Sequence, residues 1–467
     1  MAKLKIKGKD IRKIGFPDNK IIGMAIDAVH RYFKHEKKEN VLAIFEKLKN
    51  RPEDFLGDEA LGNIALLMMP VEEEKTFEIA IADEPLDFNI FGREHIDDSA
   101  VLQMKNAMRL PVTEAGALMP DAHHGYGLPI GGVLATRDAI IPYAVGVDIG
   151  CRMKLSIYDI PESYLNQHSY KLKTVLTEWT CFGMGKVLSV AQDHEVIDRK
   201  EFDEIPFLKN LQRKAQRQLG SSGSGNHFVE FGIAELKNNN KLDIPTGRYL
   251  AILSHSGSRG LGATIATHYT KLAQVHCPLP REVKNLAWLD LNKEEVKEYW
   301  LAMNLAGDYA SACHDRIHLN IAKALGIKPI VKVENHHNFA WEEIHNGEEL
   351  MVHRKGATPA GKDVLGIIPG SMTAPGFIVS GKGEPASLNS ASHGAGRLLS
   401  RTKAKQSITN SALKKMLKSE GIELIGGGLD EAPIAYKDIH QVMKSQKQLV
   451  NIEGTFFPKI VRMDRAK

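Results

Sequence analysis

Tyr249-Leu-Ala-Ile-Leu-Ser-His255, together with the Ser-Gly-Ser-Arg-Gly-Leu-Gly262 that follows it, is the clearest indication of the fold in this sequence. A short apolar run that ends in glycine-rich sequence is typical of a buried strand, because glycine favours the turn that ends it. The residues after this turn, Ala263 to His276, have the apolar spacing of a helix. The stretch therefore predicts a strand, a tight turn and a helix in that order.

Short apolar runs beside glycine-rich loops continue over the chain from about residue 90. Further strands are expected at Ile130–Thr136, Tyr143–Asp148 and Leu350–His353, and a further helix from Lys284 to about Ala306. Strands and helices mix without a regular βαβ alternation. This predicts one large α+β domain rather than a doubly wound parallel sheet.

Residues 1–85 have a different, helical pattern. Two sets of apolar residues recur there at helical spacing: Ile22, Ile26, Val29 and Phe33, then Val41, Phe45 and Leu48. Arg51-Pro52 is expected to end the second helix, and a third is expected to start near Asp58 and stop before Pro70. We therefore divide the chain into a helical segment, 1–85, for packing or partner docking, and an α+β domain, 86–467.

The composition bounds the classes of function. Of the 467 residues, 43% are apolar and 25% are charged, as in soluble globular proteins. No apolar run reaches the length of about 18 residues that would indicate a transmembrane helix. No signal peptide is recognisable, so a cytoplasmic location is expected. The net charge of +4 does not require a nucleic-acid partner, but 61 basic residues could form local positive patches.

Five segments place histidine, cysteine or aspartate beside glycine, mostly where an apolar strand ends. They are Pro120-Asp-Ala-His-His-Gly-Tyr-Gly127, Asp148-Ile-Gly-Cys151, Ser224-Gly-Asn-His227-Phe228, Ser254-His255-Ser-Gly-Ser-Arg-Gly260 and Asn335-His-His337-Asn338. Glycine lets the backbone approach a ligand closely, so polar residues among glycines indicate a site. A single strand-end histidine is more often structural, but five such segments favour a functional site.

Cys151 and Asp148 indicate a metal site, because a turn of three residues could bring both to one ion. A thiolate with imidazoles suits zinc, and an added carboxylate makes manganese or iron an alternative. A thiolate can also bridge two ions. Cys181, Cys277 and Cys313 form no CxxC pair, so we interpret them as buried apolar thiols rather than as a disulfide framework or a zinc ribbon.

A second cluster has the composition of a phosphate site. Ile368-Pro-Gly-Ser371-Met372 offers consecutive backbone N–H groups and a hydroxyl in a tight turn. A helix from about His393 would place His393, Arg397 and Arg401 on one face, where guanidinium groups suit phosphate oxygens. This histidine could act as a base, a metal ligand or a covalent nucleophile.

From about Pro120 to Lys444 these segments closely resemble the RtcB family of RNA-splicing ligases. The motifs that carry the resemblance occur in the family's order: Pro-Asp-x-His-x-Gly-x-Gly, Val-Asp-Ile-Gly-Cys, Gly-Asn-His-Phe-x-Glu, His-Ser-Gly-Ser-Arg-Gly-Leu-Gly, His-His-Asn, Arg-Lys-Gly-Ala, Ile-Ile-Pro-Gly-Ser-Met and Ser-His-Gly-Ala-Gly-Arg-x-x-Ser-Arg-Thr-Lys-Ala. The resemblance implies a GTP- and manganese-dependent ligase. It would join an RNA 3′-phosphate or 2′,3′-cyclic phosphate to a 5′-hydroxyl in RNA repair or tRNA splicing, with a protein cofactor as a further partner to consider.

The resemblance also implies a role for individual residues. Cys151 would bridge two manganese ions, whose other ligands would be Asp148, His227, His255 and His337. His393 would attack the α-phosphate of GTP and carry GMP, with Arg397, Arg401 and Lys355 as further catalytic residues. The residues that would contact the nucleotide are Asn226, His227, Phe228, Val229, Glu230, His337, Asn338, Pro369, Gly370, Ser371, Met372, His393, Gly394, Ala395 and Gly396.

Three positions depart from the family's usual pattern. Arg152 replaces the glycine that usually follows the cysteine, Gly376 replaces a nucleotide-contacting serine, and Met463 aligns with a base-contacting lysine. Residues that could replace this lysine are Lys459, Arg462 and Lys467. The alternatives to a ligase are a metal-dependent RNA phosphodiesterase or phosphatase, which would need no His393, and a catalytically silent RNA-binding subunit.

Overall fold

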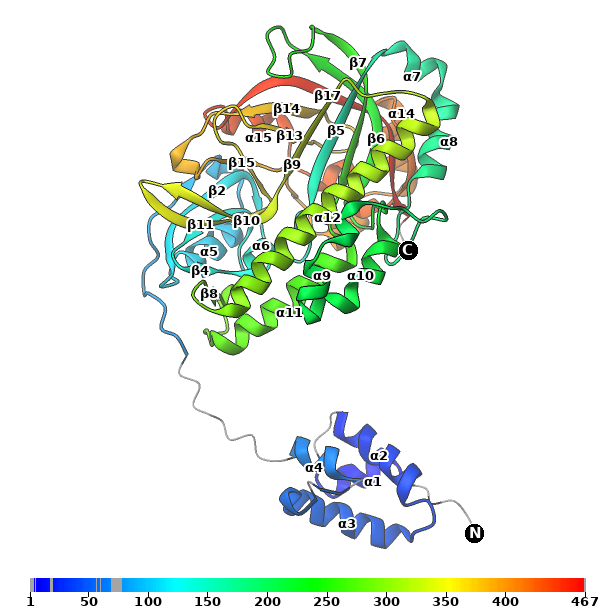
Figure 1. Ribbon diagram of the computed structural model, residues 1–467, viewed down its shortest axis with the longest axis vertical. Coiled ribbons are helices and arrows are strands. Elements are labelled where there is room, and N and C mark those ends of the chain that lie inside the picture. Colours follow the sequence, from blue (N-terminus) through cyan, green and yellow to red (C-terminus); the bar gives the residue numbers. More distant parts are fainter. Residues whose placement is uncertain are drawn as a thin grey trace. The chain divides into compact units, whose positions relative to one another are not determined.

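The computed structural model describes residues 4, 6–16, 20–55, 57–58, 60–68 and 78–465. The chain divides into two compact units, residues 1–77 and residues 78–467, each with apolar residues buried inside it (Figure 1). Among the described residues, no helix is both long and apolar enough to cross a bilayer.

The smaller unit is a group of short helices around its own core. Its helices are α1 (Gly8–Lys13), α2 (Lys20–Tyr32), α3 (Lys38–Asn50) and α4 (Gly62–Met68). The sequence predicted α2 and α3, including the end of α3 before Arg51, but did not predict α1. The third helix spans Gly62–Met68, and Asp58 Oδ1 accepts from the backbone N–H groups of Ala60 and Leu61 in the turn before it, as expected of the predicted N-cap side chain.

The boundary between the units lies before residue 78 rather than after residue 85. The backbone N–H of Ile79 donates to the Pro278 carbonyl at 2.8 Å, and that of Ala82 donates to the Arg109 carbonyl at 2.9 Å. Residues 78–85 are therefore part of the larger unit, which the sequence began at residue 86.

The larger unit contains two main sheets and two short β-pairs. The five-stranded sheet has the order β1 (Asn89–Ile90), β2 (Thr113–His123), β3 (Ile130–Thr136), β11 (Glu348–Lys355) and β10 (Asn338–His345). The eight-stranded sheet has the order β13 (Leu365–Ile368), β14 (Gly376–Gly381), β17 (Val450–Arg465), β6 (Phe228–Leu236), β7 (Gly247–Ser256), β5 (Arg152–Pro161) and β9 (Val331–His336), with β16 (Glu423–Gly427) paired to β17. The short pairs are β12 (Ala357–Pro359) with β15 (Ser390–Ser392), and β4 (Ala139–Ile140) with β8 (Leu289–Asp290).

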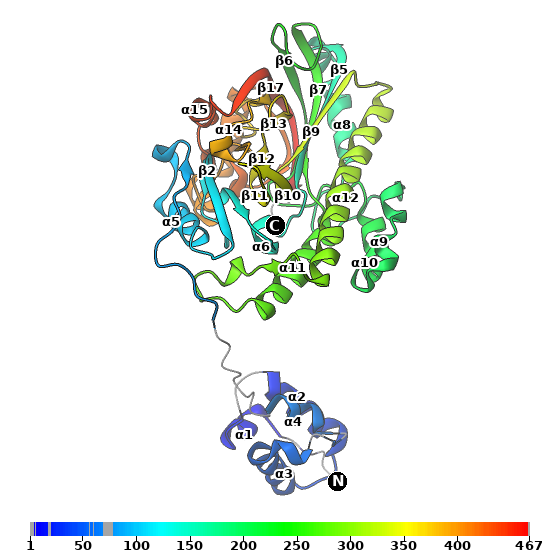
Figure 2. The ribbon, with the colours of Figure 1, turned by 60° about the vertical axis from the view of Figure 1, so that its left-hand side comes forward.

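Helices cover these sheets, and the α+β prediction is confirmed. The longest, α12 (Glu294–Leu325), packs against β5 and β7, with α11 (Arg259–His276) beside it (Figure 1, Figure 2). The others in this unit are α5 (Asp98–Ala107), α6 (Pro142–Val145), α7 (Ser163–Gln167), α8 (Ser169–Trp179), α9 (Glu201–Glu204), α10 (Pro206–Gln218), α13 (Arg401–Ser407), α14 (Asn410–Ser419) and α15 (Ile439–Ser445).

Two predictions of secondary structure were wrong for local reasons. Residues 143–148 do not form a strand, because Pro142 starts the short helix α6 and Gly146, with φ +96°, ends it. The helix expected from Lys284 starts only at Glu294 and runs on to Leu325, because Leu289–Asp290 pairs with β4 and interrupts the helical pattern.

The expected helix from His393 was also wrong. His393 follows β15 directly, and α13 begins only at Arg401, where the Ser400 side chain accepts from the backbone N–H of Lys403. Gly396 has φ +72°, and a Cβ there would lie 2.1 Å from the Asp121 carbonyl oxygen, so the chain turns tightly against β2. Residues 393–400 are therefore a loop on the five-stranded sheet.

Candidate active site

Four of the predicted metal ligands lie at the same edge of the eight-stranded sheet. Cys151 precedes β5, His227 precedes β6, His255 lies near the end of β7, and His337 follows β9. These four strands are neighbours in the order β6, β7, β5, β9, and each neighbouring pair is antiparallel. The start of β5 and of β6 therefore meets the end of β7 and of β9, and Asp148 reaches the same place from the turn before Cys151.

The five side chains form two overlapping groups that share Cys151. In one group, Cys151 Sγ lies 3.2 Å from His255 Nε2, which lies 3.2 Å from His337 Nε2. In the other group, Cys151 Sγ lies 3.5 Å from His227 Nε2, and this nitrogen lies 3.0 Å from Asp148 Oδ2. One sulfur, three imidazoles and one carboxylate in this arrangement fit two transition-metal ions bridged by a thiolate.

The protonation equilibria of this cluster follow from its burial. Burial, and then the charge of Asp148, raise the pKa of the Cys151 thiol. Burial, and then repulsion by His227, lower the pKa of His255 to about 3, while burial also holds the pKa of His337 well below its usual value. His255 and His337 are therefore neutral, which is the form that binds a metal, and a bound cation would deprotonate the thiol.

Hydrogen bonds fix the orientation of two of these rings. His227 Nδ1 lies 2.8 Å from the Ser222 carbonyl oxygen and 2.9 Å from Arg259 Nη2. His255 Nδ1 lies 3.2 Å from the Asn226 carbonyl oxygen. Both rings therefore turn Nε2 toward Cys151. Hydrogen bonds to the other ring nitrogen are a common way to hold histidine ligands in place.

His393 is held beside this cluster by a carboxylate that the sequence interpretation did not assign. Asp121 is fully buried, and its Oδ2 accepts from His393 Nδ1 at 2.6 Å and from the backbone N–H of His393 and Gly394 at 3.2 and 3.3 Å. Burial opposes ionisation of Asp121, but the charge and hydrogen bond of His393 outweigh it, so its pKa lies below the ordinary value. This pairing occupies Nδ1 and leaves Nε2 as the nitrogen available for reaction.

The rings of His393 and His337 lie with their centroids 4.9 Å apart, so this histidine adjoins the metal ligands. The only sequence signal for its partner was the Pro120-Asp121 dipeptide at the start of the first glycine-rich segment.

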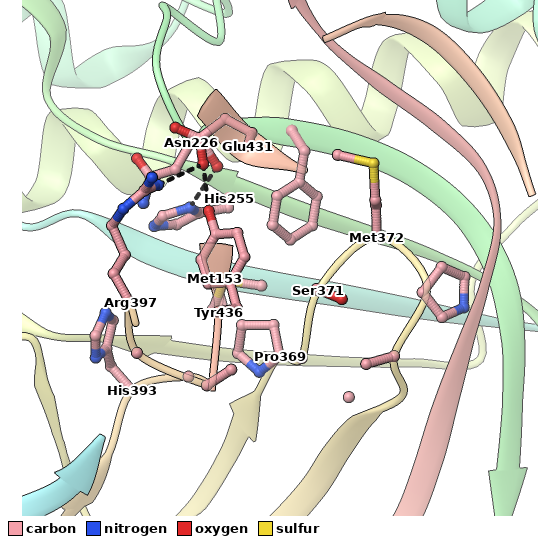
Figure 3. Close-up of a pocket in the computed structure, with 18 of the residues that line it drawn as sticks. Met153, Asn226, His255, Pro369, Ser371, Met372, His393, Arg397, Glu431 and Tyr436 are labelled. Atoms are coloured by element: carbon pink, nitrogen blue, oxygen red, sulfur yellow. Dashed lines mark hydrogen bonds and ion pairs between the residues drawn. The ribbon is translucent and has the colours of Figure 1, made fainter. Parts of the chain in front are cut away.

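A cavity of about 330 Å³ adjoins His393 (Figure 3). It brings together most of the residues predicted to contact a nucleotide: Asn226, Phe228, Glu230, His337, Pro369, Gly370, Ser371, Met372, His393, Gly394, Ala395 and Gly396. His227, Val229 and Asn338 do not line it. Val229 lies between Phe228 and Glu230 on β6, where side chains alternate between faces, and Asn338 instead accepts from the Gly356 N–H at 2.9 Å.

Arg397 and Arg401 converge on Glu431 rather than sharing a helix face. Arg397 Nη1 lies 3.1 Å from Glu431 Oε2, and Arg401 Nη1 lies 2.7 Å from Glu431 Oε1. The Tyr436 hydroxyl donates to the same carboxylate (Figure 3). All four side chains line the cavity, so both arginines reach it although the predicted helix is absent.

Lys355 lies outside the cavity lining. Its ammonium donates to the carbonyl oxygens of Tyr126 and Tyr143, the latter at 3.1 Å, and stands 4.8 Å from the Tyr143 ring centroid. Burial lowers the pKa of Lys355 to about 7. A neighbouring glycine makes room for His393, because a Cβ at Gly356 would lie 3.2 Å from His393 Cε1.

The other end of the cavity is mainly apolar and contains two of the three departures from the family pattern. Gly376 and Met463 line it, together with Phe228 and Met372, and Glu230 contributes a carboxyl group whose pKa is raised by burial. Arg462 does not replace the missing lysine there. Its guanidinium donates to the Leu176 carbonyl and lies 5.7 Å from the Phe182 ring centroid, and Lys467 lies outside the described residues.

Known proteins of one family match most of this chain in sequence. A sequence profile described as tRNA-splicing ligase RtcB matches residues 103–210 and 198–463, so the helical unit lies outside the matched residues. RNA-splicing ligase RtcB1 of Escherichia coli is 34% identical over 387 residues, which cover 76% of this chain and 92% of that protein. RNA-splicing ligase RtcB of Escherichia coli K12 is 33% identical with the same coverage, and tRNA-splicing ligase RtcB of Nanoarchaeum equitans is 29% identical over 76% of this chain and 88% of its own. The chain therefore belongs to the RtcB family.

Proposed function

We propose that this protein is a GTP- and manganese-dependent RNA ligase. It would join RNA ends that carry a 3′-phosphate or 2′,3′-cyclic phosphate to 5′-hydroxyl ends, in RNA repair or tRNA splicing. The observation that supports this best is the position of His393, paired to Asp121 and adjoining a cluster built around one shared thiolate. The relatives named as RNA-splicing and tRNA-splicing ligases support the same substrate class, and the composition is compatible with the cytoplasm.

The first proposed step is transfer of a nucleotide to His393. Nε2 attacks the α-phosphorus of GTP, an N–P bond forms, and pyrophosphate leaves. Asp121, bonded to Nδ1, stabilises the positive charge that develops on the ring. Arg397 and Arg401 bind phosphate oxygens from the cavity wall. Two manganese ions at the Cys151 cluster would neutralise phosphate charge and orient the attacking groups.

The later steps transfer that nucleotide to RNA and then release it. An oxygen of the RNA 3′-phosphate attacks the phosphorus on His393, the N–P bond breaks, and the RNA end carries GMP. The 5′-hydroxyl of the second strand then attacks the RNA phosphate, and GMP leaves. A cyclic phosphate would first be opened by water. The second step regenerates free His393, as nucleophilic catalysis requires.

The decisive test is formation of a covalent nucleotide adduct. Protein loaded with manganese and incubated with radiolabelled nucleoside triphosphates, one at a time, should form an acid-labile, alkali-stable adduct with GTP. The adduct should be absent in His393→Ala, whose metal content serves as the folding control. No adduct with any of the four triphosphates would refute the proposal. Opening of cyclic phosphate that survives His393→Ala and needs no GTP would instead favour a phosphodiesterase.

A further inference from the structure

Helices α13 and α14 carry charge of one sign only. Residues 401–419 contain six Lys or Arg and no Asp or Glu, whereas the whole chain has a net charge of only +4. All six basic side chains are exposed. Arg401 and Lys405 are paired with Asp430, but no ion pair with Lys403, Lys414, Lys415 or Lys418 occurs within the described part of the chain. The function proposed above does not use these four lysines.

A second cavity, of about 290 Å³, lies against α14. Leu413 and Leu417 contribute apolar surface to it, while Lys414 and Lys418 contribute ammonium groups. The opposite wall is Gly426–Gly428, where no side chain narrows the space. Glycine is required there, because Gly426 has φ +81° and a Cβ on it would lie 2.3 Å from the Met463 carbonyl oxygen. The cavity therefore combines apolar surface, open backbone and positive charge.

This second cavity shares a wall with the nucleotide cavity. Leu413 and Leu417 pack on their inner side against Met372 and Met463, which line the nucleotide cavity. The chain that leaves the second cavity at Gly428 also enters the nucleotide cavity three residues later, at Glu431. Arg401, where the basic segment begins, lines the nucleotide cavity as well. The basic segment thus begins at the proposed reaction site and ends at the second cavity, which Lys414 and Lys418 line.

We infer that α13, α14 and the second cavity bind the RNA strand a few nucleotides from the end that is joined. This inference rests on the proposed function, because the RNA end must reach His393. A base or ribose would lie on Leu413 and Leu417, and the phosphodiesters on its two sides would face Lys414 and Lys418. Single-stranded nucleic acids are commonly held in this way, by a basic groove beside apolar surface. An acidic protein segment would match the charge but would leave a nucleotide-sized cavity unused.

The inference is tested by the affinity for RNA and its dependence on salt. The probe is a fluorescent single-stranded RNA with a 3′-phosphate, titrated with manganese-loaded protein in the absence of GTP. Lys414→Gln/Lys418→Gln should raise the Kd about ten-fold, because each lost phosphate contact removes roughly half a decade of affinity. The slope of log K against log salt should become shallower by about 1.4, since single strands give about 0.7 per contact.

The matched control is Lys271→Gln/Lys297→Gln, which removes the same charge from exposed positions of α11 and α12, two helices that line neither the nucleotide cavity nor the second cavity. It should leave the Kd, the salt slope and RNA joining unchanged. An equal loss of affinity in both pairs, or no loss in either, would overturn the inference. Adduct formation with GTP needs no RNA, so it reports the proposed function separately from this surface.

Discussion

The two ends of the proposed nucleotide cavity differ in the interactions that position their side chains. At the His393 end, Asp121 fixes the ring and four strands of one sheet bring Cys151 and the histidines together. At the Met463 end, apolar side chains surround a single carboxyl group, Glu230. Hydrogen bonding and strand pairing position the side chains at the first end, whereas apolar packing mainly shapes the second end. Mutations at the first end should therefore sharply reduce adduct formation, whereas mutations at the second end should change which nucleotide is accepted.

The largest effect is expected from Cys151→Ser, which removes the sulfur shared by both ligand groups. Adduct formation should fall at least about 1,000-fold, or ~4 kcal/mol, because charge stabilisation by both ions would be weakened together. Elemental analysis should show less than the natural protein's manganese content, and an unchanged content would contradict the shared-ligand interpretation.

A smaller loss is expected from Asp121→Asn, which keeps a side chain of similar shape but removes the negative charge facing His393 Nδ1. The rate of adduct formation should fall about 100-fold, or about 2.7 kcal/mol, because the ring loses the group that stabilises its positive charge. The bound manganese should stay at the natural level. If metal is lost as well, Asp121 supports the whole end of the cavity rather than the nucleophile alone.

At the opposite end, Glu230→Gln should alter selectivity rather than chemistry. Glu230 is a carboxyl group in otherwise mainly apolar surroundings, so its hydrogen bonds should discriminate between bases. The ratio of kcat/KM for GTP over ATP in adduct formation should fall about ten-fold, while metal content stays constant. A rate that falls equally for both nucleotides would show that the two ends are not separable in this way.

The remaining prediction concerns the stability of the fold rather than activity, and it contrasts buried charges. Burial lowers the pKa of Lys355 from 10.5 to about 7 in the folded protein. Below pH 7 both states hold the proton, and the folded state bears a buried cation. Between about pH 7 and 10 only the unfolded chain holds it, so the free energy of unfolding should rise with pH by at most about 1.4 kcal/mol per unit.

This contribution should be missing in Lys355→Met, which keeps the side-chain volume without the charge. Urea unfolding of the natural protein and the variant across that pH range gives the comparison. Parallel curves for the two proteins would show that Lys355 remains charged when folded.

The sequence predicted which residues come together at the candidate site better than it predicted the secondary structure around them. Each predicted metal ligand stands next to a glycine or at a strand end, and each lies within a short motif, so the resemblance carried by these motifs was enough to propose all five. Asp121 was missed because its partner His393 is 272 residues away, and nothing local reveals that contact. The helix proposed from His393 failed for the same reason, since Arg397 forms an isolated bridge with Tyr436 and Gly396 turns against Asp121.

The register of the strands has a consequence for metal binding during folding. Phe228 stands opposite His255, and Arg152 stands opposite both Ser256 and His336, so pairing alone aligns the ligands that precede, end or follow these strands. A slip of one residue between β7 and β5 would turn His255 to the other face of the sheet. Uptake of a transition metal during refolding would thus report that four distant chain segments have paired correctly, because the cation would bind only when the strands are in register.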